Sequence, residues 1–135
     1  MRDLYNNIAV RRSISPVAVS NNTAAVGEVV DGLGYGSATY LIAAGTLADS
    51  DATFTTLLEH SDQSDTGFDA VPDSGLIGTE ALASFDYADD DTLLKLGYIG
   101  GKRYTRLTIT PGGNSGSAPI AAIAVLGHAH LAPVA

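Results

Sequence analysis

Short apolar segments separated by turn-forming residues run along most of the chain. Residues 23–30 alternate between the two faces of a strand. Residues 38–45 are a short apolar run bounded by glycines, which predicts a strand buried on both faces, and residues 119–127 are continuously apolar, which predicts a central strand. No long helical pattern is evident. Short strands at regular intervals predict an all-β fold, a single antiparallel β-sandwich that is jelly-roll-like. The strands are expected at residues 14–20, 23–30, 38–45, 54–60 and 119–127, with two more within residues 93–110.

Residues 93–110 carry the clearest β pattern. Two apolar segments joined across Gly100-Gly101 predict a β-hairpin whose inward residues belong to the core. The expected core residues are Leu96, Tyr98, Leu107 and Ile109. Four of the seven basic residues of the chain also lie in this segment: Lys95, Lys102, Arg103 and Arg106.

Composition limits the classes of function. A chain of 135 residues with 45% hydrophobic and 16% charged residues is long enough for one domain with a real core. Its formal net charge of −8 argues against a nucleic-acid partner, which needs a basic surface. No run of about 20 apolar residues predicts a membrane span. No apolar segment follows the first basic residue, so no secretory signal is expected.

The N-terminal residues differ in pattern from the rest. Asn6-Asn7 and the residues that follow are poor helix formers, so we expect residues 1–13 to form an extended arm that includes Arg11 and Arg12. Residues 14–135 are expected to form the single sandwich domain. The arm is either a frayed terminus or a basic segment that lies on an acidic neighbour.

One serine motif resembles that of an enzyme. Residues 113–117, GNSGS, resemble the segment around the nucleophilic serine of glutamyl proteases, and His60 and the aspartates of residues 86–91 precede Ser115 in the required order. A Pro-Gly-Gly-Asn-Ser-Gly run is also typical of a turn, and 135 residues are too few for two six-stranded barrels. We therefore predict no catalytic residue and no enzymatic activity.

Two acidic loops and a histidine pair are candidate metal sites. Residues 62–73 match an EF-hand loop in part, but the bidentate Glu is replaced by Asp73 and no flanking helices are predicted. Residues 86–91 supply further carboxylates. Solvated acidic loops are the favoured interpretation, with calcium as the open alternative. His128 and His130 lack a third ligand for zinc, so we predict no metal.

The glycine-rich segment at residues 32–36 is a candidate phosphate-binding loop. Its GxGxG pattern is followed by a strand, whereas a dinucleotide site requires GxGxxG before a helix. We therefore predict no cofactor.

Basic residues are the candidate partner-binding residues. In an acidic, charge-poor chain, a basic stripe indicates an interface for an acidic protein surface, although pairing with the chain's own aspartates is the alternative. If residues 102–106 form a strand, Arg103 and Thr105 share one face, and Lys102 and Arg106 share the other. The predicted partner-binding residues are Arg11, Arg12, Lys102, Arg103 and Arg106.

Four segments resemble those of a family of small structural proteins of tailed bacteriophages. They are residues 44–65, 76–91, 95–111 and 124–130, and the most specific of them contains GYIGGKRYTRLTIT. The likeness covers nearly the whole chain. It implies a virion protein encoded near the capsid genes and assembled in the host cytoplasm. Small β proteins in such positions are often capsid cement or decoration proteins, and some are trimeric.

The resemblance implies function by binding. The main hypothesis is an auxiliary capsid protein that binds the major capsid protein or other virion proteins and stabilises the shell, as a homo-oligomer, with a trimer as one option. The first alternative is a tail, connector or baseplate component. The second is a carbohydrate-binding adhesion module, for which Tyr35, Tyr87 and Tyr98 are the candidate residues because the chain has no Trp.

Overall fold

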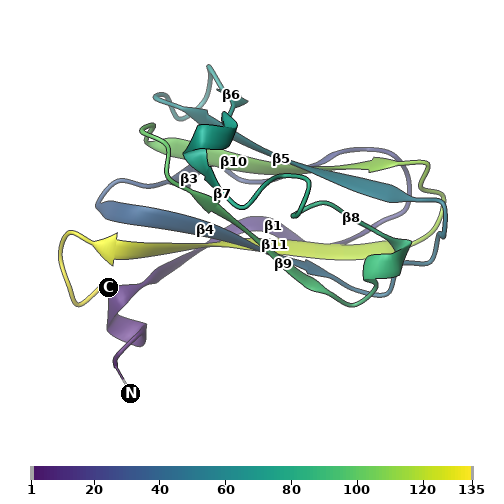
Figure 1. Cartoon of the computed structure of the whole chain (residues 1–135), viewed down its shortest axis with the longest axis horizontal. Helices are drawn as coiled ribbons and strands as arrows, with labels where there is room; N and C mark the ends of the chain where they lie inside the picture. The colour runs from purple at the N-terminus through teal and green to yellow at the C-terminus, as the bar shows by residue number, and fades with distance from the viewer. Residues whose placement is uncertain (1, 135) are drawn as a thin grey trace.

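The computed structural model describes residues 2–134, which form two antiparallel β-sheets packed face to face (Figure 1). One short 3₁₀ helix precedes the first strand and two lie between strands, and no described helix is long and apolar enough to cross a membrane. The elements are η1 (Tyr5–Asn7), β1 (Ala9–Val19), β2 (Ala25–Val26), β3 (Val30–Asp31), β4 (Tyr35–Ala44), β5 (Thr53–Ser61), β6 (Asp69–Ala70), η2 (Asp73–Gly75), β7 (Leu76–Ile77), β8 (Phe85–Asp86), η3 (Tyr87–Asp89), β9 (Leu93–Tyr98), β10 (Tyr104–Gly112) and β11 (Ala118–Ala129).

Every strand pairing in the two sheets is antiparallel. The five-stranded sheet has the order β1-β11-β4-β9-β7. The six-stranded sheet is built on the order β2-β10-β5-β6, with β3 also paired to β10 and β8 to β5. The prediction of an all-β, jelly-roll-like antiparallel sandwich is therefore confirmed.

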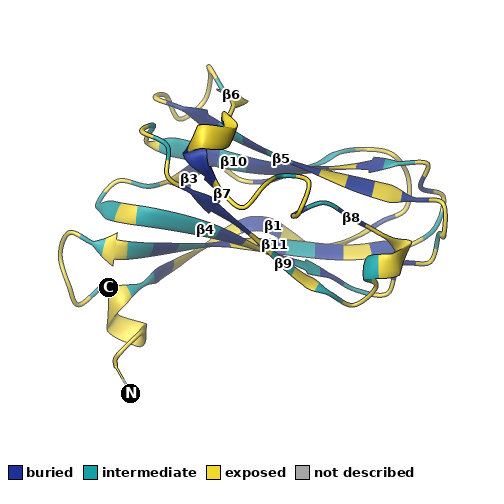
Figure 2. Ribbon diagram, viewed as in Figure 1, coloured by how far each residue is buried: buried dark blue, intermediate teal, exposed yellow. Residues whose placement is uncertain are grey.

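The core lies between the sheets because the inward residues of their strands are apolar. Buried and exposed residues alternate along the strands (Figure 2). The Tyr40 hydroxyl crosses the core to Thr105 Oγ1 at 2.7 Å, and burial raises the pKa of Tyr40 to about 12. Phe54 and Phe85 stack with ring centroids 4.9 Å apart. The largest fully buried side chains include Tyr40, Ile42, Leu47, Phe54, Leu58, Leu96, Leu107, Ile109 and Leu126.

The predicted hairpin at residues 93–110 is wrong. Its two strands, β9 and β10, belong to different sheets, and residues 99–103 cross from one sheet to the other. The four residues predicted for its core are buried, each facing the same interior from its own sheet. Alternation along a strand specifies its inward side, but it carries no information on which strand lies beside it.

The long strand predicted at residues 23–30 is also wrong. Two short strands, β2 and β3, replace it on the edge of β10. Between them Gly27 donates from its backbone N–H to the Leu107 carbonyl at 2.7 Å, and a Cβ at Gly27 would lie 2.5 Å from that oxygen. This close approach requires glycine and interrupts the regular alternation.

The N-terminal arm is shorter than predicted. Strand β1 begins at Ala9, so residues 9–13 belong to the edge strand of the five-stranded sheet and only the residues before them precede it. Val134 N–H donates to the Asn6 carbonyl at 2.8 Å, which brings the two ends of the described chain together (Figure 1). Arg11 and Arg12 therefore lie on a paired strand.

The prediction that β4 is buried on both faces is wrong, because Leu41 is 38% exposed. The prediction that residues 119–127 form a central strand is confirmed by β11, yet Ile123 on its outer side is 43% exposed. No other described element covers the outer side of the five-stranded sheet. Its apolar outer residues are the most unusual feature of the surface.

Candidate functional site

The outer face of the five-stranded sheet is apolar along most of its strands. Strand alternation directs Tyr40 and Ile42 inward and Leu41 outward, and the same rule directs Ile123 outward between two buried alanines. Leu93 is 82% exposed on β9. We call this surface the outer apolar face; its main residues are Val10, Leu41, Ala43, Ile77, Leu93, Pro119, Ala121, Ile123 and Val125.

Cross-strand pairing makes the outer apolar face continuous. In one row Arg12 lies opposite Ile123, Ile123 opposite Leu41, and Leu41 opposite Lys95. Three strand spacings separate the two cations of this row, or about 14 Å. Outward residues in neighbouring rows are also mostly apolar. A continuous exposed patch of this kind is typical of a binding surface.

One end of the outer apolar face is hollowed. The hollow has a volume of about 460 Å³, and only apolar residues and a glycine line it. Small side chains on three strands, among them Ala43 and Ala121, leave this space between the larger residues. The lining residues include Pro16, Ala18, Ala43, Gly45, Pro119 and Ala121. The shape would accept an apolar side chain from a partner.

Gly97 leaves room for the side chain of Ile77 on the neighbouring edge strand, β7. A Cβ at Gly97 would lie 2.9 Å from the Ile77 Cβ, so the side chain of Ile77 occupies the space above the glycine. Ile77 itself is 61% exposed. It extends the apolar surface onto β7.

The electrostatics of the outer apolar face are one-sided. No Asp or Glu occupies an outward position on the five paired strands. Arg12 and Lys95 are the cations of the central row, and neither forms an ion pair with a residue between 2 and 134. The chain has 15 acidic residues and seven Lys or Arg residues, yet the charged residues of the central row are both basic.

Three of the predicted partner-binding residues contact acids of their own chain. Arg103 donates two hydrogen bonds of 2.8 Å to Asp31, which lowers the pKa of the Asp31 carboxyl. Arg106 pairs with Glu59 at 3.0 Å, and its guanidinium carbon lies 4.4 Å from the centre of the Phe68 ring. The third residue, Lys102, lies 3.9 Å from Asp69. That these residues bind a partner stays a prediction.

These basic residues do not form one strand face. Strand β10 begins at Tyr104, so Lys102 and Arg103 lie in the crossing loop and only Arg106 is on the strand. Arg11 and Arg12 point to opposite sides of β1, with Arg12 on the outer apolar face. The structure thus brings only one of the five predicted residues to this surface.

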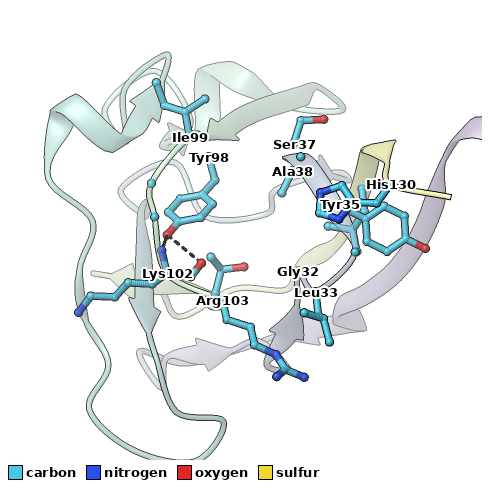
Figure 3. A pocket seen from close by; sticks show the side chains of 16 residues that line it. Gly32, Leu33, Tyr35, Ser37, Ala38, Tyr98, Ile99, Lys102, Arg103 and His130 are labelled. Atoms are coloured by element: carbon cyan, nitrogen blue, oxygen red, sulfur yellow. Dashed lines mark hydrogen bonds between the residues drawn. The ribbon is translucent and has the colours of Figure 1, made fainter.

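A pocket of about 370 Å³ opens at one end of the sandwich, between the two sheets. Residues 32–38 and 98–103 face each other across it, so the two glycine-rich segments of the sequence meet here (Figure 3). The Tyr98 hydroxyl bonds to His60 Nδ1 at 2.9 Å and accepts from the Lys102 backbone N–H at 3.0 Å. The Lys102 side chain points away from Tyr35 and His130, so its charge is not directed into the pocket (Figure 3).

The residues considered for a protease triad do not meet. Ser115 Oγ donates to Asp49 at 2.9 Å, whereas the His60 ring is paired with Tyr98. Gly112, close to Ser115, lies opposite Thr53, and His60 is seven residues further along β5, roughly 23 Å away. Hydrogen bonds from the backbone N–H groups of Asp51 and Ser115 and from the Ser115 hydroxyl lower the pKa of Asp49. Asp49 and Ser115 therefore join two loops at this end.

The acidic loops and histidines do not converge on one point. Within residues 2–134 no group of three His, Asp or Glu side chains has the arrangement of a metal site. Asp86 and Asp89 instead cap the 3₁₀ helix η3. His128 Nδ1 lies 2.8 Å from Ser37 Oγ, and His130 lines the end pocket.

Comparison with known proteins finds similar solved structures but no matching family. No family model and no curated protein matches the chain. Among solved structures it is similar to the PBSX exported protein XepA, with a TM-score of 0.56 and 15% identity over 88% of this chain and 37% of that one. The chain thus spans little more than a third of XepA. At this identity the likeness shows the β-sandwich fold alone.

Carbohydrate-binding proteins are also among the similar structures. The CBM22-1–GH10 modules of Clostridium thermocellum xylanase 10B align with a TM-score of 0.47 and 12% identity over 97% of this chain and 28% of that one. The xylan-binding module CBM15 aligns with a TM-score of 0.40 and 14% identity over 96% of both chains.

Sequence reasoning missed the principal residues of the outer apolar face. Leu41 lies in a segment predicted to be buried on both faces, and Ile123 lies in a continuously apolar segment predicted to be a central strand. Lys95 was noted only as part of a basic segment. The signal available in the sequence was a lone cation within the apolar strand LLKLG, at residues 93–97.

Proposed function

We propose that this chain is a structural protein of a bacteriophage virion and that it acts by binding another virion protein through the outer apolar face. The exposed, continuous apolar surface of the five-stranded sheet carries the proposal, since the largest apolar patch on a protein surface is often a functional one. The resemblance of four sequence segments to phage structural proteins supports it. The similarity of fold to the PBSX exported protein XepA is consistent with it.

The size of the outer apolar face favours a role on a repeating lattice. Four strand spacings by about 20 Å of strand give roughly 400 Å², about half of the 800 Å² that each partner buries in a standard interface. One such contact is weak. Many copies on a symmetric capsid would sum to high avidity, which is how an auxiliary capsid protein stabilises a shell.

In this role the protein acts without catalysis. His60 and Ser115, two residues of the protease-like motif, each have a structural partner. The major capsid protein is the proposed partner. A homo-oligomer, such as a trimer, would form through surfaces other than the outer apolar face.

Quantitative mass spectrometry of purified particles tests the proposal. We expect the protein in hundreds of copies per particle. A few copies per particle would favour the tail, connector or baseplate alternative, and absence from purified particles would refute the virion role.

A carbohydrate-binding role is the second candidate. The end pocket brings Tyr35 and Tyr98 together, and both were predicted as sugar-binding residues. Aromatic rings that line a pocket of about 370 Å³ would suit one or two sugar units. Glycan-array binding that Tyr35→Ala abolishes and Tyr87→Ala retains would support this role; absence of any binding would remove it.

A further inference from the structure

We propose that the outer apolar face recognises an apolar patch bordered on two sides by carboxylates about 14 Å apart on a different protein, and that its charges oppose pairing with a second copy of this chain. This inference rests on the proposed function and specifies the chemistry of the partner. The carboxylate spacing is that of Arg12 and Lys95, three strand spacings apart.

The first argument for this inference is the sign of the charges on the outer apolar face. A chain with a formal charge of −8 has acidic residues in excess, and added carboxylates would keep an exposed sheet soluble. Instead, the charges of the central row are Arg12 and Lys95, and no acid has an outward position on the paired strands. Two isolated cations at the ends of an apolar row are what a partner with acidic borders requires.

Symmetry gives the second step. A closed pair of identical faces is related by a two-fold axis in the plane of contact, so if one residue meets a second residue of the other copy, that second residue meets the first in return. With the rows aligned, Arg12 meets either Arg12 or Lys95 of the second copy. In other alignments of the paired strands each cation meets an uncharged strand residue, because the outward strand positions hold no acid. Self-pairing would therefore remove the two cations of each copy from water without a counter-charge from the strands, which is unfavourable.

The hollow beside the row gives the third step. It lies on the same face, and only apolar residues and a glycine line it. Seated there, a protruding apolar side chain of the partner would fix the position of the contact along the strands. The two cations would fix its position across them.

Sedimentation velocity of the purified protein tests the opposition to self-pairing. Lys95→Glu makes the row self-complementary, because each substituted position then meets Arg12 of the second copy. We expect Lys95→Glu to dimerise at least tenfold more tightly than the wild type, and the added change Arg12→Glu to abolish the gain. The control Arg2→Glu changes the net charge equally but lies before the first strand, and it should not dimerise.

Two results of the sedimentation experiment would overturn the inference. One is a wild-type oligomer that Leu41→Thr dissolves, since the outer apolar face would then be a self-interface. The other is equal dimerisation of Lys95→Glu and the Arg2→Glu control.

Photo-crosslinking in purified particles tests the partner. A benzoylphenylalanine at position 41 is expected to crosslink to another virion protein, at an apolar site flanked by Asp or Glu on both sides. The same group at position 55, exposed on the other sheet, serves as the control. A crosslink from position 41 to a second copy, or none in particles that contain the protein, contradicts the inference. Absence of the protein from particles refutes the proposed function. The sedimentation experiment on the purified protein still tests whether Arg12 and Lys95 oppose pairing with a second copy.

Discussion

The two outer faces of this sandwich are built from strands of similar length but differ in chemistry. On the six-stranded sheet the outward positions of β5 and β10 hold several threonines, and Thr55 lies opposite Thr110. On the five-stranded sheet the corresponding central pair is Leu41 opposite Ile123. Both sheets bury apolar residues on their inner sides. The difference is what the proposed function predicts, with one outer face in contact with water and the other with a partner.

The charges of the two faces differ in the same way. On the six-stranded sheet Arg106 and Glu59 lie opposite each other and form a 3.0 Å ion pair, which the Phe68 ring partly covers. On the five-stranded sheet Arg12 and Lys95 are separated by two apolar residues of the row. A face whose charges are satisfied internally has little to offer a partner, whereas unpaired charges around an apolar patch give orientation to a contact.

The largest expected effect is on binding through the outer apolar face. Leu41→Asp should weaken binding to particles by more than about thirtyfold, because an unpaired carboxylate in an apolar contact costs about 2 kcal/mol or more. Co-sedimentation with particles that lack the protein measures the effect. Thr55→Asp, on the other outer face, is the matched control, and equal losses for both variants would remove the distinction between the faces.

The ion pair of the six-stranded sheet should affect stability. Glu59→Ala leaves Arg106 partly buried without its carboxylate and should lower the free energy of unfolding by about 1–3 kcal/mol. Urea denaturation measures this loss. Glu28→Ala, at an exposed position, should change stability by less than about 0.5 kcal/mol. A loss for Glu59→Ala no larger than that of the control would show that the pair is not stabilising.

Acid should lower the stability of the protein through His60, an inward residue of the same sheet. Burial, and secondarily the charge of Lys102, lower the pKa of His60 below its ordinary value of 6.5. The folded state therefore favours neutral His60, so its contribution to stability is present above pH 6.5 and is lost as the pH falls through the lowered pKa. Urea midpoints at successive pH values should decrease in that range.

His60→Gln should flatten this decrease, whereas His128→Gln, an exposed control, should retain it. The lowered pKa values of Asp31 and Asp49 act below their ordinary value of 3.8, so the two effects separate by pH. An unchanged slope in His60→Gln would assign the acid sensitivity to other groups.

The smallest expected effect is on the stability contributed by the outer apolar face. Leu93→Thr should change the free energy of unfolding by less than about 0.5 kcal/mol, because Leu93 is 82% exposed. The same change at Leu94, which packs against the core, should cost more. Thermal unfolding compares the two variants, and a large loss for Leu93→Thr would show that this leucine stabilises the fold itself.

Pattern predicted some elements better than others. The segments at residues 38–45, 54–60 and 119–127 are strands, because a short apolar run between turns has few other stable solutions. Residues 93–110 were assigned two strands correctly and a hairpin wrongly. Turn residues such as Gly100-Gly101 allow the chain to reverse, and they serve equally well for a crossing between sheets.

The candidate site was less predictable than the fold. The basic residues chosen from the sequence mostly contact the chain's own acids, as Arg103 does with Asp31. Such pairs join strands that are distant in sequence, so no local pattern identifies them. The outer apolar face was hidden for a related reason, since an apolar run has the same appearance whether its second side meets protein or water.

Sequence alone determined the all-β class, the position of most strands and the inward residues of each, because side-chain alternation is a local property of a strand. Tertiary structure decided which strands are neighbours, which charges are paired and which apolar side remains uncovered. These depend on contacts between distant segments, and loop closure and packing select among arrangements that satisfy the same alternation. Leu41 and Ile123 illustrate the division: their place on a strand follows from the sequence, and their exposure follows only from the fold.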